Sequence, residues 1–312
     1  MQPLFPCPTA TWHKDTYENI SPLRSELSVA GKTVIIIGGG SGIGRETVYA
    51  FASAGAAHIA LLGRTDATLQ ETAKSIPSTS KTSHSVHVAD LTKTESLKTA
   101  AAAAVGKWNI LVICSGYCPT PSPIPSSKGE DWWKGFEVSS FFLIFDPLVE
   151  LLIILTSLLA RTNVYGTFLA TKAFLPTADS SQAAILGVTS DVSLLPVTYL
   201  PGLSSYVSSK LAQAKIYEFI AAENPSIFVA TVNPGMVETE NFYRTGATPD
   251  KVPIDTVQLP AHFLVWMASP EATFLRGRCA WANWDVEELK AQKDMILEGL
   301  FMTAGFKGLP KI

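Results

Sequence analysis

A tyrosine and a lysine four residues apart are the side chains in this sequence best suited to proton transfer. Tyr206 and Lys210 lie in a helical pattern that begins at Ser205, so both project from one face of the helix. A tyrosine with an ordinary pKa, about 10, is a poor acid or base at neutral pH. A neighbouring ammonium favours the phenolate, so we expect Lys210 to lower the pKa of Tyr206 into a useful range.

A serine at the end of a predicted strand is a further polar candidate for the site. The run from Ala183 to Ser190 predicts a buried strand, and Ser190 closes it. Ser193, further along, is the second candidate. We favour Ser190, because loops lengthen more readily than strand ends move.

A glycine-rich stretch follows the first predicted strand and has the form of a phosphate-binding turn. Val34 to Ile37 is β-branched throughout, and a helical pattern begins at Arg45. Glycine lets the backbone approach a pyrophosphate, and a helix N-terminus offers free N–H groups and the positive end of its dipole. The residues expected to bind the dinucleotide here are Gly38, Ser41, Gly42, Ile43 and Gly44.

Together these motifs resemble the short-chain dehydrogenase/reductase family. The resemblance rests on Gly38-x-x-x-Gly42-x-Gly44, the strand-end serine and the Tyr206-x-x-x-Lys210 pair, and it covers about residues 28–290 apart from one insert. It implies an oxidoreductase that moves a hydride between C4 of a nicotinamide and a carbonyl or secondary alcohol carbon. The stretch Ile113-Cys-Ser-Gly116 departs from the family's usual Asn-Asn-Ala-Gly, and Ile37 stands where the family usually has Thr.

The resemblance also implies roles for individual residues. Tyr206 would be the general acid in reduction, Lys210 would orient the cofactor, and Ser190 would bind the substrate oxygen. Asn163 would hold a water that relays protons toward Lys210. The family's usual spacing to the tyrosine favours Ser193, so the choice of serine stays open. Further cofactor contacts would come from Asp90, Leu91, Gly116, Pro234, Gly235, Val237 and Thr239.

The end of the second predicted strand indicates which dinucleotide is bound. An acidic residue there selects NAD, whereas an arginine accommodates the 2′-phosphate of NADP. This chain has Gly63-Arg64, and a guanidinium suits a phosphate. NADP is therefore the expected cofactor and NAD the less favoured one.

Strand and helix patterns alternate along the chain. Strands are predicted at 34–37, 58–64, 85–91, 109–116, 183–190, 227–233 and 277–282, with helices between them. This order predicts an α/β fold with a doubly wound parallel sheet, a Rossmann fold, whose site lies at the carboxyl ends of the strands. Residues 31–312 would form a single domain behind an irregular arm, 1–30. Residues 119–125 and 240–258 would line the substrate pocket.

Composition narrows the partners. The net charge of −3 without a basic patch argues against nucleic acid, and the four cysteines lack a metal-binding spacing, so no metal is expected. Free thiols and an N-terminus unlike a signal peptide favour a cytoplasmic location. The expected partner is a small carbonyl or alcohol substrate.

One segment, 139–162, interrupts the family pattern with 24 mostly apolar residues. Asp146, Pro147 and Glu150 lie in its middle, which argues against a membrane span. Joining Val138 to Asn163 restores a continuous helix start, so we hypothesise that the insert is a gene-model artefact. It would disturb both Asn163 and any homo-oligomer. Two other classes stay open: a non-catalytic NADP-binding protein, and a membrane-surface protein anchored through 141–160.

Overall fold

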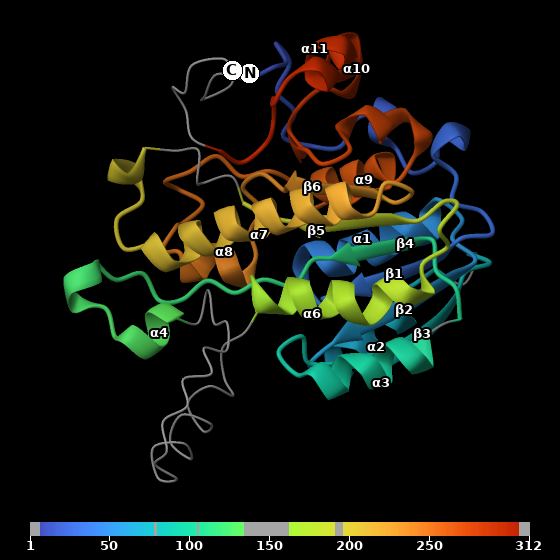
Figure 1. The fold of residues 1–312 in the computed structure, drawn as a ribbon, viewed down its shortest axis with the longest axis horizontal. Coiled ribbons are helices and arrows are strands. Elements are labelled where there is room, and N and C mark those ends of the chain that lie inside the picture. The colour runs from blue at the N-terminus through green and yellow to red at the C-terminus, as the bar shows by residue number, and fades with distance from the viewer. Residues whose placement is uncertain (1–6, 78–79, 105, 134–161, 191–195, 306–312) are drawn as a thin grey trace.

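The computed structural model describes residues 7–77, 80–104, 106–133, 162–190 and 196–305. Within these residues, seven parallel strands form one sheet in the order β3-β2-β1-β4-β5-β6-β7 (Figure 1). Strands β1, β4 and β5 are almost entirely buried runs of aliphatic residues, as expected for strands covered on both faces. The strands are β1 (Thr33–Ile37), β2 (His58–Gly63), β3 (Ser83–Val88), β4 (Ile110–Ile113), β5 (Ala184–Val188), β6 (Phe228–Asn233) and β7 (Cys279–Trp281).

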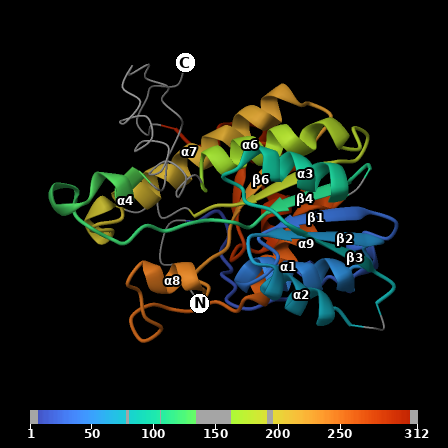
Figure 2. The same cartoon turned by 90° about the horizontal axis from the view of Figure 1, so that it is seen from below.

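Helices cover both faces of the sheet. They are α1 (Gly42–Ser53), α2 (Asp66–Lys74), α3 (Thr94–Ala104), α4 (Gly129–Trp133), α6 (Tyr165–Phe174), α7 (Ser204–Glu223), α8 (Glu240–Arg244), α9 (Gln258–Met267), α10 (Val286–Ala291) and α11 (Lys293–Glu298). Helices α3, α6 and α7 lie on one face, and α1, α2 and α9 on the other (Figures 1 and 2). Each face has its own apolar cluster, with Phe51 and Trp266 in one and Phe174 and Tyr217 in the other.

This arrangement confirms the predicted doubly wound α/β fold, although several boundaries differ. Strand β3 ends at Val88, so Asp90 and Leu91 lie in the following loop and not within the strand. Helix α1 begins at Gly42, before the expected Arg45. The segment 240–258, expected to be a loop, opens with the short helix α8, whose first turn is capped by the Thr239 hydroxyl.

The strand order places a switch point beside β1. The chain runs outward from β1 to β3 and then returns to β4 on the other side of β1. In open α/β sheets, ligands bind at such a point, outside the carboxyl ends of the strands. The turns after β1 and β4 meet there, since a Cβ on Gly38 would lie 2.8 Å from Ser115 Oγ.

The N-terminal arm packs against the rest of the protein. Ile20, Leu27 and Val29 are buried in the apolar cluster that contains α1 and α9. The backbone nitrogen of His13 donates to the carbonyl of Asn283 at 2.8 Å, and Asn283 Nδ2 donates to the carbonyl of His13 at 2.9 Å. Residues near the two ends of the chain are thereby joined beside the sheet.

Most of the predicted insert lies outside the described residues. Helix α4 ends at Trp133 and α6 begins at Tyr165, so the predicted break between Val138 and Asn163 falls largely in the segment 134–161, of which the structure describes nothing. In the part of the chain that is described, no helix has the length and apolar character needed to cross a membrane.

Candidate active site

The glycine turn between β1 and α1 leaves no room for side chains. Gly38 and Gly42 have φ angles of +91° and +50°, a region that favours glycine. A Cβ on Gly44 would lie 2.0 Å from the carbonyl oxygen of Gly38, so only glycine fits this close packing of helix on turn. Ser41 is the exposed N-cap of α1, and its side chain caps none of the first-turn N–H groups. The turn therefore has the close-packed backbone and exposed helix start expected of a phosphate site.

The residues predicted to hold the adenosine end lie around the carboxyl end of β2. Arg64 follows this strand directly and is exposed, and its guanidinium makes no ion pair or hydrogen bond with any described residue. The Asp90 carboxylate accepts hydrogen bonds from the backbone nitrogen and the hydroxyl of Thr92, at 2.9 and 2.7 Å. Leu91 is buried. The cation is thus available to a ligand, whereas Asp90 braces its own loop.

Helix α7 brings Tyr206 and Lys210 together, as predicted. The ammonium of Lys210 lies 6.0 Å from the centre of the Tyr206 ring. Burial raises the pKa of Tyr206 to about 12, the Cys118 thiol adds to the rise, and a hydrogen bond with Ser190 opposes it. The direction is opposite to the sequence-based expectation, because burial disfavours the charged phenolate. The bond from Ser190 places that serine beside Tyr206, whereas Ser193 lies outside the described residues.

Lys210 is buried beneath the ends of β4 and β5. Its Nζ donates to the carbonyl of Val188 at 3.2 Å and to Gln213 Oε1 at 2.9 Å. A Cβ on Gly116 would lie 3.2 Å from this Nζ, so the ammonium packs against the turn after β4. Burial lowers the pKa of Lys210 to about 8, and the thiols of Cys118 and Cys114 oppose the fall. The lysine therefore titrates near neutral pH.

Asn163 lies two residues before α6 and is fully buried. Its Oδ1 accepts from the backbone nitrogen of Tyr117 at 2.8 Å, and its Nδ2 donates to the carbonyl of Tyr117 at 2.8 Å and to Ser209 Oγ at 3.0 Å. Its own carbonyl accepts from the Thr167 hydroxyl at 2.8 Å. Asn163 thus fixes the loop after β4 and reaches α7 through Ser209.

The segment 234–239 follows β6 and is held by two distant polar residues. Gly235 has a φ of +78°, and a Cβ there would lie 2.4 Å from Asp255 Oδ2 and 2.8 Å from Asn283 Oδ1. Burial raises the pKa of Asp255, and its hydrogen bond from the Met236 amide opposes the rise. Asp255 and Asn283 therefore close around the Gly235 turn, which has no room for a side chain.

The rest of this segment runs back toward the glycine turn. Pro234 opens it, directly after the last residue of β6, and Val237 is buried. The methyl group of Thr239 would lie 3.2 Å from a Cβ on Gly42. The predicted cofactor residues after β1 and β6 are therefore brought together.

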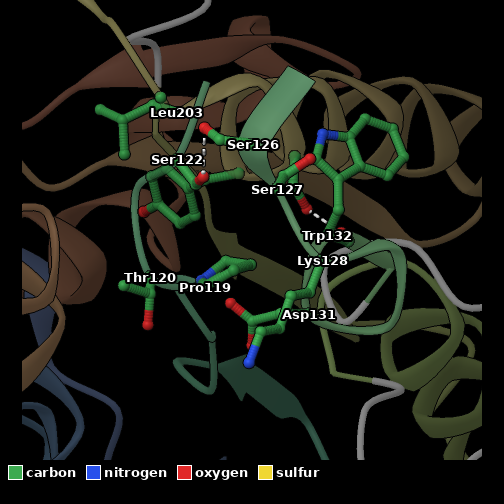
Figure 3. Close-up of a pocket in the computed structure, with 12 residues that line it drawn as sticks. Pro119, Thr120, Ser122, Ser126, Ser127, Lys128, Asp131, Trp132 and Leu203 are labelled. Atoms are coloured by element: carbon green, nitrogen blue, oxygen red, sulfur yellow. Dashed lines mark hydrogen bonds between the residues drawn. The ribbon is translucent and has the colours of Figure 1, made fainter. Parts of the chain in front are cut away.

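A cavity of about 460 Å³ opens beside Tyr206. Its wall combines the proline-rich loop, as predicted, with α4 and the start of α7. Figure 3 shows Lys128 and Asp131 on one side of this cavity and a hydrogen bond between Ser122 and Ser126 on another. The described lining residues are Pro119, Thr120, Ser122, Ser126, Ser127, Lys128, Asp131, Trp132, Gly202, Leu203, Ser205 and Tyr206.

The segment 240–258, expected to line this pocket, contributes none of those residues. It turns instead toward the loop after β4, where Asn241 Nδ2 donates to the carbonyl of Gly116 at 3.1 Å. The Arg244 guanidinium lies 5.3 Å from the centre of the Tyr117 ring. These two contacts hold α8 against the predicted cofactor side of the site.

Sequence reasoning missed several polar residues that position this site. Gln213 and Thr167 are buried and connect Lys210 with Asn163. Gln213 lies three residues after Lys210, and this helical spacing could have identified it. Asp255 and Asn283 lack such a signal, because they are far in sequence from the turn they hold.

Comparisons with known proteins agree with the fold and with these motifs. The sequence model of the family described as "short chain dehydrogenase" matches residues 32–152 and 155–249. The break between the matched segments falls inside the predicted insert. A "Short chain dehydrogenase/reductase" of Claviceps purpurea is 34% identical, with 96% of this chain and 94% of that protein covered. The "Short chain dehydrogenase/reductase AacuD" of Aspergillus aculeatus is 29% identical, with 96% of each chain covered.

Solved structures share the architecture at lower sequence identity. A short-chain type dehydrogenase/reductase from Mycobacterium ulcerans superposes with a TM-score of 0.66 at 20% identity, covering 81% of this chain and 89% of that one. A short chain dehydrogenase from Shigella flexneri, complexed with NADP, gives 0.66 at 19% identity, covering 83% and 99%. These two structural similarities show the fold alone. The assignment to a family rests on the family model and on the Claviceps relative. This chain belongs to the short-chain dehydrogenase/reductase family of Rossmann-fold oxidoreductases.

Proposed function

We propose that the protein is an NADP-dependent oxidoreductase that interconverts a carbonyl compound and a secondary alcohol. The observation that carries the proposal is that Ser190 and Lys210 lie close to Tyr206, which lines the cavity. A proton donor, a hydrogen-bond partner and a buried cation are the groups that reduction of a carbonyl requires around its oxygen.

The residues around the glycine turn fit a dinucleotide. Gly42 leaves backbone exposed where a pyrophosphate would approach, Gly38 and Gly44 keep the turn close-packed, and the N-terminus of α1 supplies the positive dipole end. Lys210 and Gly116, with the segment 234–239, would hold the nicotinamide half. When bound, NADPH supplies the hydride at C4 of its nicotinamide.

The protein's own side chains handle the proton. In reduction, the Tyr206 hydroxyl donates its proton to the substrate oxygen as that oxygen gains charge, and Ser190 donates a hydrogen bond to the same atom. The Lys210 ammonium, protonated below about pH 8, stabilises the resulting phenolate. In oxidation the same groups act in reverse. The cavity can hold a substrate of drug-like size, since typical small-molecule sites span about 300–1,000 Å³.

The preference for NADP is supported by Arg64. Its guanidinium lies directly after β2, exposed and without a partner among the described residues. A 2′-phosphate would give this cation a bidentate partner that the ribose hydroxyl of NAD lacks. The Shigella flexneri neighbour is complexed with NADP, in agreement with this choice of cofactor.

A substrate screen tests the proposal. Purified protein is mixed with NADPH and a panel of ketones and aldehydes, or with NADP and secondary alcohols, and absorbance near 340 nm is followed. We expect turnover with at least one class and none with Tyr206→Phe. NADPH binding without turnover on any substrate would support the non-catalytic alternative instead.

We also propose that α6 and α7 form the interface of a homo-oligomer, which the segment 139–162 would disturb. Phe168, Leu211 and Phe219 on these neighbouring helices are 48%, 45% and 60% exposed, and a second copy would cover them. Sedimentation velocity tests this. A chain without residues 139–162 that stays monomeric at tens of micromolar would overturn it.

A cytoplasmic location completes the proposal. All four cysteines are free thiols, which suits a reducing compartment. Fractionation of cells that express a tagged chain tests the location. Recovery of the protein in the membrane pellet would favour the membrane-surface alternative.

A further inference from the structure

A chain of buried hydrogen bonds links Lys210 to Asn163 through two side chains that the proposed chemistry does not use. Lys210 Nζ donates to Gln213 Oε1 at 2.9 Å, and Gln213 Nε2 donates to Thr167 Oγ1 at 2.9 Å. Thr167 Oγ1 in turn donates to the carbonyl of Asn163 at 2.8 Å. The four residues are between 0% and 4% exposed. Each of these residues donates to the next one outward from the ammonium, so the three hydrogen bonds run in one direction and form one network.

The network fixes how the ammonium is oriented. An ammonium has three donors. Two of them are taken by Gln213 Oε1 and the Val188 carbonyl, and the Nζ atom lies against Gly116. One donor therefore remains for the cofactor and for Tyr206. Because Thr167 holds the other end of the amide, Gln213 cannot turn its oxygen away from Nζ without breaking a buried bond.

We propose that Gln213 is the positioning residue of this site, and that its amide oxygen aims the free donor of Lys210 at the bound cofactor. The inference rests on the proposed function. Thr167 acts indirectly, because its hydroxyl accepts a hydrogen bond from the Gln213 amide and so holds that amide in place. Neither residue touches substrate, so their effects must appear through Lys210.

Gln213 also affects the charge of Lys210. Burial lowers the pKa of Lys210 to about 8, and an acceptor oxygen at 2.9 Å favours the charged form. The other titratable groups that face Lys210 are Tyr206 and the thiols of Cys114 and Cys118. Burial raises the pKa of each, to about 12, 12 and 11 respectively, so these groups stay neutral near pH 8. A pH dependence near pH 8 therefore reports on Lys210.

The first test compares two substitutions at Gln213. NADPH fluorescence titrations across about pH 6 to 9.5 follow binding without turnover. We expect Gln213→Leu to weaken binding roughly tenfold or more and to move the loss of binding to lower pH. Gln213→Glu keeps an acceptor oxygen and adds a negative charge, so it should retain binding and move the loss to higher pH. A role in packing alone would leave the pH dependence of Gln213→Leu unchanged.

The second test uses two threonines on α6. Thr167→Val removes the bond to Gln213, and we expect it to weaken NADPH binding severalfold. Thr171→Val is the matched control, because Thr171 is buried one turn further on and its hydroxyl has no hydrogen-bond partner among the described residues. This control should bind NADPH within about twofold of wild type.

The outcomes separate the inference from the proposed function. If wild-type protein binds NADPH and the folded Gln213→Leu variant matches it in affinity and pH dependence, the inference is wrong. If Gln213→Leu does not fold, the threonine pair decides, and equal binding by the two variants overturns the inference. A wild-type chain that binds no nicotinamide dinucleotide overturns the proposed function and the inference with it.

Discussion

The carboxylate of Asp255 accepts a hydrogen bond of 2.7 Å from the backbone nitrogen of Met236, across 19 positions of sequence. This bond holds the turn at Gly235, where the chain passes between Asp255 and Asn283. The relationship connects the end of the segment 240–258 with the residues expected to bind the nicotinamide.

Replacing Asp255 should therefore affect both stability and cofactor binding. Asp255→Ala leaves the Met236 N–H without its partner, and we expect a loss of about 1–3 kcal/mol of unfolding free energy and weaker NADP binding. Chemical denaturation and calorimetric titration measure the two effects. Asp255→Asn keeps an acceptor oxygen and should bind NADP nearly as wild type does. Equal losses in both variants would contradict this account.

The same carboxylate gives a pH dependence of known sign. Burial raises the pKa of Asp255 above its ordinary value of 3.8, so the folded state binds this proton more tightly than the unfolded state does. The contribution of Asp255 to stability is therefore greatest at low pH and falls as pH rises through the folded pKa. Asp255→Asn should remove this fall. The melting temperature of Asp255→Asn minus that of wild type should be larger at pH 7 than at pH 4.

Tyr206→Phe should abolish turnover and leave NADP binding nearly unchanged. The ring and its packing remain, and only the hydroxyl that exchanges the proton is lost. Steady-state rates and calorimetric titration of the same preparation test both parts. Lys210→Met should damage binding as well as turnover. A Tyr206→Phe enzyme with near-wild-type rates would show that another group supplies the proton.

Turnover should fall as pH rises through about 8. Lys210 is a base with a lowered pKa, so it is an ammonium below that pH and neutral above it. The pH profile of kcat/KM for carbonyl reduction measures this limb. Lys210→Arg keeps its charge at all accessible pH values, so its profile, although lower overall, should lack the fall near pH 8. An unchanged limb in that variant would assign the titration to another group.

Arg64→Ala should weaken NADP binding by about 1.5–3 kcal/mol, the range for a hydrogen bond to a charged group. NAD binding should change little, because NAD lacks the phosphate. Lys74→Ala provides a control, since it removes an exposed cation from the far end of α2. Wild-type protein that binds NAD as tightly as NADP would contradict the assignment of Arg64.

Removing residues 139–162 should give a more soluble, more thermostable and more active protein. The deletion joins Val138 to Asn163 and restores the continuous helix start predicted from the sequence. Expression yield, melting temperature and turnover of the two chains provide the comparison. Loss of folding or activity on deletion would make the segment a functional element, and a messenger RNA that retains it as the main form would refute the artefact hypothesis.

Local sequence patterns were sufficient to predict the sheet and the main catalytic candidates. The β-branched run of β1 with the glycines after it is one local pattern, and the Tyr206–Lys210 spacing is another. Each pattern lies within a few consecutive residues. Boundaries were less accurate. Asp90 and Leu91 continue an apolar and polar alternation past the end of β3, although the strand ends at Val88 and Asp90 accepts hydrogen bonds from Thr92 in the following turn. Thr239 followed by Glu240 is a helix N-cap signal that could have revealed α8.

The pKa of Tyr206 and the bracing residues could not be predicted in this way. The spacing of Tyr206 and Lys210 indicates proximity, but only the folded chain shows that burial raises the pKa of Tyr206. Asp255 and Asn283 act on Gly235 from distant segments, and no local pattern connects them. Long-range polar contacts of this kind depend on how the strands and loops assemble.

The pair of hydrogen bonds between His13 and Asn283 also limits when the fold can be completed during synthesis of the chain. Synthesis on the ribosome starts at the N-terminus, so the glycine turn and Tyr206 emerge long before Asn283 does. Until then, His13 lacks both hydrogen bonds to Asn283, and the Gly235 turn lacks one of its two braces. A nascent chain stalled before position 283 would carry the phosphate turn and Tyr206, and Asp255 alone would brace the Gly235 turn.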